Sequence, residues 1–236
     1  MAAARRGTAQ RKLPLAERNW GGKRAGAGRK PKGPRPLGVR PAVPHLRRPE
    51  IQRRHPVHVT VRLMPDAWNL RSRRAFRVIA RALGGAAEAG LRLTHYSVQG
   101  NHLHLIGEAE TRATLSRAMR SLNIRVAKGL NELMRRARGR VIADRYHVAV
   151  LDKPQLVRNA VRYVLSNTRK HLVQAGKAVG RFTEDAYAAG PAEHVPGVMR
   201  LVPHPLLDGP LVQPPRSWLL REGWRRAARR PALAAR

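Results

Sequence analysis

The sequence predicts an α+β fold of the ferredoxin-like βαββαβ type, with an antiparallel sheet and one additional helix. Four segments alternate apolar and polar residues as half-buried strands do, and three others carry apolar residues at helical spacing. Gly100-Asn101 lies between two of the strands and is typical of a tight hairpin turn. The resulting order, strand, helix, strand, strand, helix, strand, helix, is that of a βαββαβ unit followed by a helix.

The first half of this unit contains three strands and one helix. Apolar and polar residues alternate along the first strand, so that its valines share one face. A helix follows from Ser72, and a glycine is expected to end it, either at Gly84-Gly85 or at Gly90. The strands are predicted at 55–63, 91–98 and 102–109.

The second half contains a long helix, a strand and a third helix. Thr111 is suited to cap the long helix, whose apolar stripe continues to Leu133. The fourth strand is predicted at 139–151. Asp152 is predicted to cap the third helix, at about 154–171, and Pro154 suits its first turn.

The composition indicates a polyanionic partner. The formal net charge is +34 and the isoelectric point is near 12.0, and such an excess of one sign opposes folding. Nucleic acid is the leading candidate partner, and an anionic membrane surface is the second. No stretch approaches the roughly 18 consecutive apolar residues of a membrane span. Because the chain has no cysteine, disulfides and thiolate metal sites are excluded.

The compact region is expected at 55–172, between two flanks. Residues 1–54 are rich in Arg, Lys, Gly and Pro and are predicted to form a disordered basic arm. Residues 173–236 form a Gly- and Pro-rich extension, in which SWLLREGWRR (217–226) is an amphipathic segment able to dock back. The opening stretch has no apolar run that could serve as a signal-peptide core. Arg-rich openings also occur in organelle transit peptides, but here the basic character runs along the whole chain, so we expect a location in the cytoplasm, with the nucleoid.

Two histidines share one face of the third strand. Because side chains at i and i+2 point the same way, His102 and His104 can chelate one divalent ion. Tyr163 and Asn167 lie one turn apart on the last helix. If that helix covers the histidines, Asn167 supplies a third ligand and Tyr163 can attack a phosphate as a covalent nucleophile. The ordinary alternatives are a polar strand face, a tyrosine at the edge of the core and a helix-end asparagine.

Basic residues in three regions are candidates for DNA contacts. Arg145 is expected to share a strand face with His147 beside the proposed site, where it could hold a phosphate or form a surface ion pair. Positions off the apolar stripe of the long helix could follow a DNA backbone, and a solvated helix face is the alternative. The candidates are Arg145, Arg117, Arg120, Arg125, Lys128 and, in the basic arm, Arg29 and Lys30.

The chain from about His55 to Trp224 resembles the single-tyrosine HUH transposases of the IS200-like type, and most of all the REP-associated tyrosine transposases. The resemblance rests on HPVHVTVRL, YSVQGNHLHLIGEA with its His-hydrophobic-His motif, DRYHVAVLDKP, YVLSN and SWLLREGW. His102 and His104 match the HUH triplet, and Tyr163 matches the nucleophile. Asn167 matches the third metal ligand.

The resemblance implies binding of single-stranded DNA folded into imperfect hairpins, within a bacterial cell. It implies cleavage with Mg or Mn that leaves a 5′-phosphotyrosine and a free 3′-OH, and a reversal that rejoins strands. It implies an additional helix that carries the catalytic tyrosine, and a monomer or a homodimer. A non-catalytic, architectural nucleic-acid binder on the same fold is the alternative.

Overall fold

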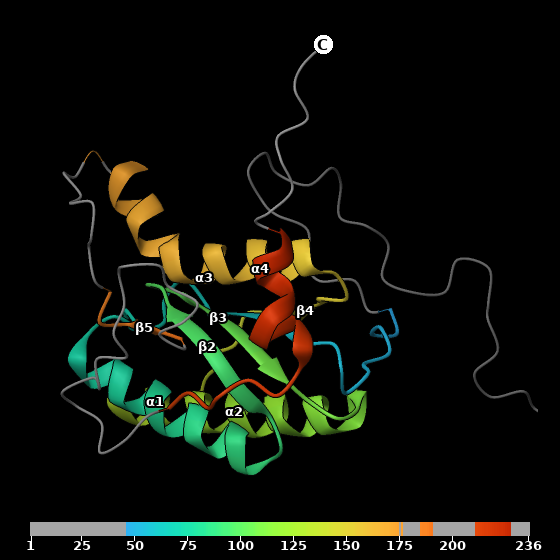
Figure 1. Cartoon of the computed structure of the whole chain (residues 1–236). Helices are drawn as coiled ribbons and strands as arrows, with labels where there is room; N and C mark the ends of the chain where they lie inside the picture. Colours follow the sequence, from blue (N-terminus) through green and yellow to red (C-terminus); the bar gives the residue numbers. More distant parts are fainter. Residues whose placement is uncertain (1–45, 175, 177–184, 191–210, 228–236) are drawn as a thin grey trace, which may run out of the picture. The chain divides into compact units, whose positions relative to one another are not determined.

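The computed structural model describes residues 46–174, 176, 185–190 and 211–227. It has the predicted α+β fold, in which a five-stranded sheet of order β4-β1-β3-β2-β5 carries helices on both faces (Figure 1). Every pair of neighbouring strands is antiparallel. The first four strands in the chain, together with the two helices that connect them, form the βαββαβ unit. The edge strand β5 lies beyond that unit in the chain and was not predicted.

The strands are β1 (Val57–Arg62), β2 (Arg92–Val98), β3 (His102–Glu108), β4 (His147–Val150) and β5 (Ala188–Ala189). The helices are α1 (Arg73–Glu88), α2 (Arg112–Leu133), α3 (Pro154–Gln174), a π-helical turn η2 (Leu219–Gly223) and α4 (Trp224–Arg226). Among these described helices, none has the length and apolar character that crossing a membrane requires.

Helix α1 begins and ends at residues that the sequence marks. The side chain of Ser72 accepts a hydrogen bond from the amide of Ala75 and so caps the helix. The helix continues through Gly84-Gly85, so the earlier of the two expected ends is wrong. It stops before Gly90, whose φ of +98° is open to glycine at little cost.

The caps of α2 and α3 differ in how well they were predicted. Thr111 caps α2 by accepting from the amide of Thr114, as expected. Pro154 occupies the first turn of α3, also as expected. The cap position itself belongs to Lys153, whose carbonyl accepts the first helical hydrogen bond, and not to Asp152. The residue before a proline is driven out of the helical region, which places the boundary at Lys153.

Strand β4 is much shorter than the predicted strand at 139–151. Upstream of it, an isolated bridge joins Ile142 to Leu63. The side chain of Asp144 then accepts a hydrogen bond from the amide of Arg145. This local bond competes with ladder pairing and turns the chain, so regular pairing begins only at His147.

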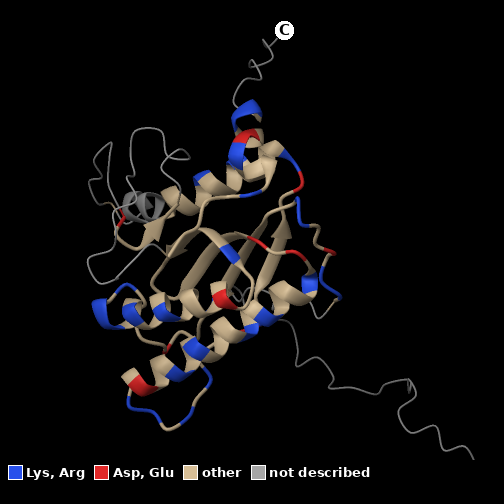
Figure 2. Cartoon of the chain, turned by 60° about the horizontal axis from the view of Figure 1, so that its bottom comes forward, with Lys and Arg blue, Asp and Glu red and all other residues tan. Residues whose placement is uncertain are grey.

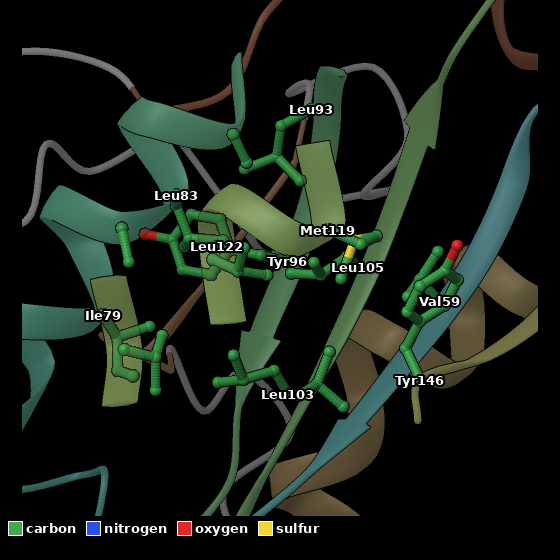
Figure 3. Close-up of a cluster of buried hydrophobic side chains, with 14 of the residues drawn as sticks. Val59, Ile79, Leu83, Leu93, Tyr96, Leu103, Leu105, Met119, Leu122 and Tyr146 are labelled. Carbon is green, nitrogen blue, oxygen red and sulfur yellow. The ribbon is translucent and has the colours of Figure 1, made fainter. Parts of the chain in front are cut away.

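The larger core lies between the sheet and the helix pair α1 and α2. The two helices approach closely at Gly129, where a Cβ atom would lie 2.5 Å from Cγ1 of Val78. Inward side chains of the strands interdigitate with both helices (Figure 3). The buried residues of this core include Val59, Leu93, Leu103 and Leu105 from the strands, Ile79 and Leu83 from α1, and Met119 and Leu122 from α2.

A second, smaller core lies on the other face of the sheet, under α3. Ile106 of β3 packs there with apolar residues of α3 and with Leu219 and Leu220 from the C-terminal segment 211–227. The carboxylate of Glu108 accepts hydrogen bonds from the amides of Arg216 and Ser217. The segment 217–226 therefore docks against the helix that carries Tyr163, next to α3 in Figure 1.

Candidate active site

Strand β3 presents its histidines to α3. Leu103 and Leu105 belong to the core under α1 and α2, so the alternating His102 and His104 face the opposite layer. Ile106, on the same face as the histidines, packs against α3. His104 is only 4% exposed, and its ring centroid lies 4.9 Å from that of His102. Helix α3 therefore covers the histidine face.

Tyr163 comes from α3 and reaches His104 of the same chain. Its Oη lies 3.5 Å from Nε2 of His104, at the outer limit of a hydrogen bond. The two rings meet edge to face, with centroids 5.0 Å apart. Tyr163 is 41% exposed. Its phenol therefore lies between a buried imidazole and solvent, where a macromolecular phosphate can approach.

Asn167 follows Tyr163 by one helical turn and is almost fully buried. It is 2% exposed, and its Nδ2 has no hydrogen-bond partner among the described residues. A buried polar group without a partner destabilises the folded protein by about 1–3 kcal/mol. Such a group therefore indicates a role other than stabilising the fold, such as binding a ligand. Because a half-turn of the amide exchanges its oxygen and nitrogen, this position can offer an acceptor to a cation.

The candidate donors at this face are the imidazole nitrogens of His102 and His104 and the amide oxygen of Asn167, one helical turn from Tyr163. Neutral nitrogen and oxygen donors fit a divalent ion and leave positions for water or a phosphate oxygen. Within the described ranges, no group of three or more His, Cys, Asp or Glu side chains is arranged to hold a metal ion. A metal at His102 and His104 would therefore depend on Asn167 and on oxygens of the substrate.

Strand β1 contributes two side chains that the sequence analysis did not single out. Nδ1 of His104 lies 3.2 Å from Oγ1 of Thr60 and 3.3 Å from Nε2 of His58. Thr60 is also the direct cross-strand neighbour of His104. The alternation that assigns the valines of VHVTVR to the core assigns His58 and Thr60 to the opposite face. The missing information was that β1 pairs with β3.

His58 is uncharged at neutral pH. Its pKa is lowered from 6.5 to about 4, first by burial and then by the charge of His147 on the neighbouring strand. Its ring packs edge-on to Tyr163, with centroids 6.0 Å apart. The site thus brings the neutral imidazole of His58 together with the imidazole of His104 and the phenol of Tyr163. The direction of each hydrogen bond between them depends on the tautomers of the rings.

Arg145 precedes β4 and does not lie in it. Its amide donates to Asp144 at 2.7 Å, and its Nη2 donates to the carbonyl of Leu46 at 3.4 Å. The prediction that Arg145 and His147 share a strand face is therefore wrong, because β4 begins at His147. His147 itself is the cross-strand neighbour of Thr60 and faces the histidine side.

The basic positions of α2 lie on the far side of the sheet from Tyr163, because α2 packs on the Leu103 and Leu105 face. Lysines and arginines recur along α1 and α2 (Figure 2). One of them, Arg125, forms an ion pair of 3.4 Å with Glu88. The structure therefore does not bring Arg117, Arg120, Arg125 and Lys128 to the candidate site, and Arg29 and Lys30 lie outside the described residues.

No protein-family model matches the chain, and none of the curated proteins matches it. Among solved structures, a REP-associated tyrosine transposase bound to a REP hairpin is similar at 15% identity and a TM-score of 0.45, covering 62% of this chain and 98% of that one. A bacterial tRNA(His) guanylyltransferase-like protein with GTP has 11% identity, a TM-score of 0.40 and coverages of 53% and 70%. Its complex with ATP has 9% identity, a TM-score of 0.39 and coverages of 55% and 65%. Similarity of this size does not identify a family, so the function must be inferred from the side chains of this chain.

Proposed function

We propose that this protein cleaves and rejoins single-stranded DNA through a covalent bond to Tyr163, assisted by a divalent metal ion. The observation that carries the proposal is the position of the Tyr163 hydroxyl, 3.5 Å from Nε2 of His104 and at the solvent edge of the histidine face. A phenol beside paired imidazoles combines a nucleophile with a place to hold a cation against a phosphate.

In the proposed first step, Oη of Tyr163 attacks the phosphorus of a phosphodiester, and the bond from phosphorus to the 3′ oxygen breaks. The phenol loses its proton to solvent, the departing 3′ oxygen takes a proton from solvent, and a 5′-phosphotyrosine remains. Attack by a 3′-OH on that phosphotyrosine reverses the step, restores Tyr163 and joins the strands. Since one phosphoester bond replaces another at each step, no nucleotide cofactor is needed.

His102, His104 and Asn167 would hold the ion, which we expect to be Mg²⁺ or Mn²⁺. When bound, such an ion supplies Lewis-acid chemistry to a phosphate oxygen. The residues of this chain do the rest of the positioning. Helix α3 carries Tyr163 and Asn167 on successive turns, and the docked residues Leu219 and Leu220 pack against that helix in the same apolar cluster as Ile106 of β3.

Hairpin-forming, REP-like single-stranded DNA is the substrate class that we propose. The net charge of +34 supports a nucleic-acid partner. The exposure of Tyr163 supports a macromolecular substrate, because the nucleophile is open to solvent and not enclosed. The resemblance of the HLHL and YVLSN segments to the single-tyrosine HUH transposases supports hairpin DNA and a bacterial, nucleoid-associated setting.

The test is the formation of a covalent adduct. The protein with Mn²⁺ and a hairpin-bearing single-stranded oligonucleotide should give a denaturant-stable protein–DNA species on a gel. Tyr163→Phe should abolish that species and still bind the oligonucleotide. Tyr146→Phe is the matched control, because the Tyr146 hydroxyl is buried and lies 3.3 Å from Ser116 of α2, in the other layer. It should form the adduct as the unmodified protein does.

Two outcomes would count against the proposal. An adduct that persists in Tyr163→Phe would assign a different nucleophile. If the unmodified protein forms no adduct with a broad pool of hairpins that it binds, the fold serves as an architectural nucleic-acid binder and not as an enzyme.

A further inference from the structure

Both histidines of the site are held through the same ring nitrogen. Nδ1 of His102 lies 2.9 Å from Oδ1 of Asn101, in the hairpin turn. Nδ1 of His104 lies 3.2 Å from Oγ1 of Thr60 and 3.3 Å from Nε2 of His58, both on β1. Nε2 of His104 is the nitrogen that faces Tyr163. The Nδ1 atoms thus contact the scaffold.

We propose that Asn101, Thr60 and His58 are positioning residues that hold both imidazoles in the tautomer with hydrogen on Nδ1. This inference deepens the proposed function, because that tautomer leaves the Nε2 lone pair of each ring for a divalent ion. A neutral imidazole carries one hydrogen, and the group bonded to the other nitrogen decides where it is. Partners of this kind set ligand orientation in metal sites.

For His102 the direction of the bond follows from the partner. The Oδ1 atom of Asn101 is a carbonyl oxygen and only accepts hydrogen bonds, so Nδ1 of His102 donates. Asn101 is exposed and His102 is half-buried. Water can therefore replace the amide if it is removed, and the effect of Asn101→Ala on His102 should be small.

His104 has two partners at Nδ1, and its ring is buried away from water. The ring is 4% exposed, so water has little access to an Nδ1–H that has lost its acceptor. The Thr60 hydroxyl and the neutral ring of His58 can each accept that hydrogen. The opposite arrangement, with His58 donating to Nδ1 of His104, would put hydrogen on Nε2 and direct it at Tyr163. In the native protein we expect that arrangement to be absent.

The first experiment is nitrogen NMR of the histidine rings in the metal-free, full-length protein. We expect a protonated Nδ1 and an unprotonated Nε2 on His102 and His104, with signals assigned by His102→Gln and His104→Gln. The double variant Thr60→Val, His58→Phe should convert His104 to a mixture of tautomers. A native His104 with hydrogen on Nε2 would overturn the proposal.

The second experiment measures Mn²⁺ affinity by electron paramagnetic resonance. Loss of an outer partner typically costs about 10- to 100-fold in metal affinity, and we expect that loss for the double variant. Thr60→Ser keeps a hydroxyl and should retain native affinity. His147→Gln is the matched control, because it removes an exposed histidine from the same face beside Thr60.

The two proposals fail in different ways. The proposed metal-dependent function fails if the native protein does not bind Mn²⁺, or binds it equally well in His104→Ala. In that case the ring tautomers still decide the role of His58 and Thr60. If Mn²⁺ binds and the double variant keeps both the native affinity and the native tautomer, the positioning role fails and the proposed function stands.

Discussion

Replacing Glu108 with alanine should release residues 216–227 from the helix that carries Tyr163. The Glu108 carboxylate is buried, and it accepts from the amide of Arg216 at 2.9 Å and from that of Ser217 at 2.7 Å. Removal of the acceptor leaves two backbone N–H groups without a partner, at about 1–3 kcal/mol each, so the variant should lose about 4 kcal/mol of the free energy that holds the segment in place.

Local opening of the segment limits how much the free energy of unfolding of the whole protein falls. Leu219 and Leu220 are buried against α3, and burial of a leucine is worth about 1.5–3 kcal/mol. The docking energy and the loss are thus of similar size, so the segment should open by itself. Val212 of the same segment is buried in the core under α1 and α2, and the amide of Gln213 donates to the carbonyl of Leu93. Residues 211–215 and that core should therefore stay in place while residues 216–227 open.

Hydrogen exchange read by mass spectrometry measures this opening. In Glu108→Ala, protection of residues 216–227 should fall by about a hundredfold or more, since about 1.4 kcal/mol corresponds to a factor of ten. Protection of α1 and α2 should not change. Glu110→Ala is the control, because Glu110 is exposed and forms a long ion pair of 3.9 Å with Arg53. Native protection of the segment in Glu108→Ala would refute the docking role of this carboxylate.

Three further predictions concern stability and DNA binding. The metal-free protein should lose about 3 kcal/mol of unfolding free energy between pH 6.5 and pH 4 because of His58, whose folded pKa is lowered to about 4. The unfolded chain takes up that proton first as the pH falls, which favours unfolding. In urea denaturation, the free energy of unfolding should therefore depend less steeply on pH in His58→Gln than in the unmodified protein. Equal slopes would contradict the role of His58. Gly129→Ala should lower the free energy of unfolding by about 1–3 kcal/mol, because the added Cβ meets Val78 at 2.5 Å. Thermal denaturation measures this loss, and Gly84→Ala is the control, because its added Cβ meets nothing within 4 Å. Deletion of residues 1–45 should weaken the salt dependence of oligonucleotide binding. The slope of log K against log salt concentration should become less negative by about 0.7 for each phosphate that the arm neutralises. An unchanged slope would show that the basic arm does not touch the DNA.

Local patterns in the sequence predicted most of the elements and several of their ends. Ser72 and Thr111 cap helices because a short hydroxyl side chain can satisfy the free amides of a first turn, which needs only neighbouring residues. The extent of β4 was mispredicted because a local bond at Asp144 interrupts pairing that the apolar pattern alone would continue.

The histidine pair and the Tyr163–Asn167 pair were each visible in the chain, since strand and helix periodicities determine which side chains share a face. The contact between Tyr163 and His104 was not visible, because it depends on burial of Val157, Val164 and Ile106 between two elements far apart in sequence. Predicting the contribution of His58 and Thr60 requires more than the strand and helix periodicities. It follows from the pairing of β1 with β3 and its register, which long-range packing selects and no local pattern encodes.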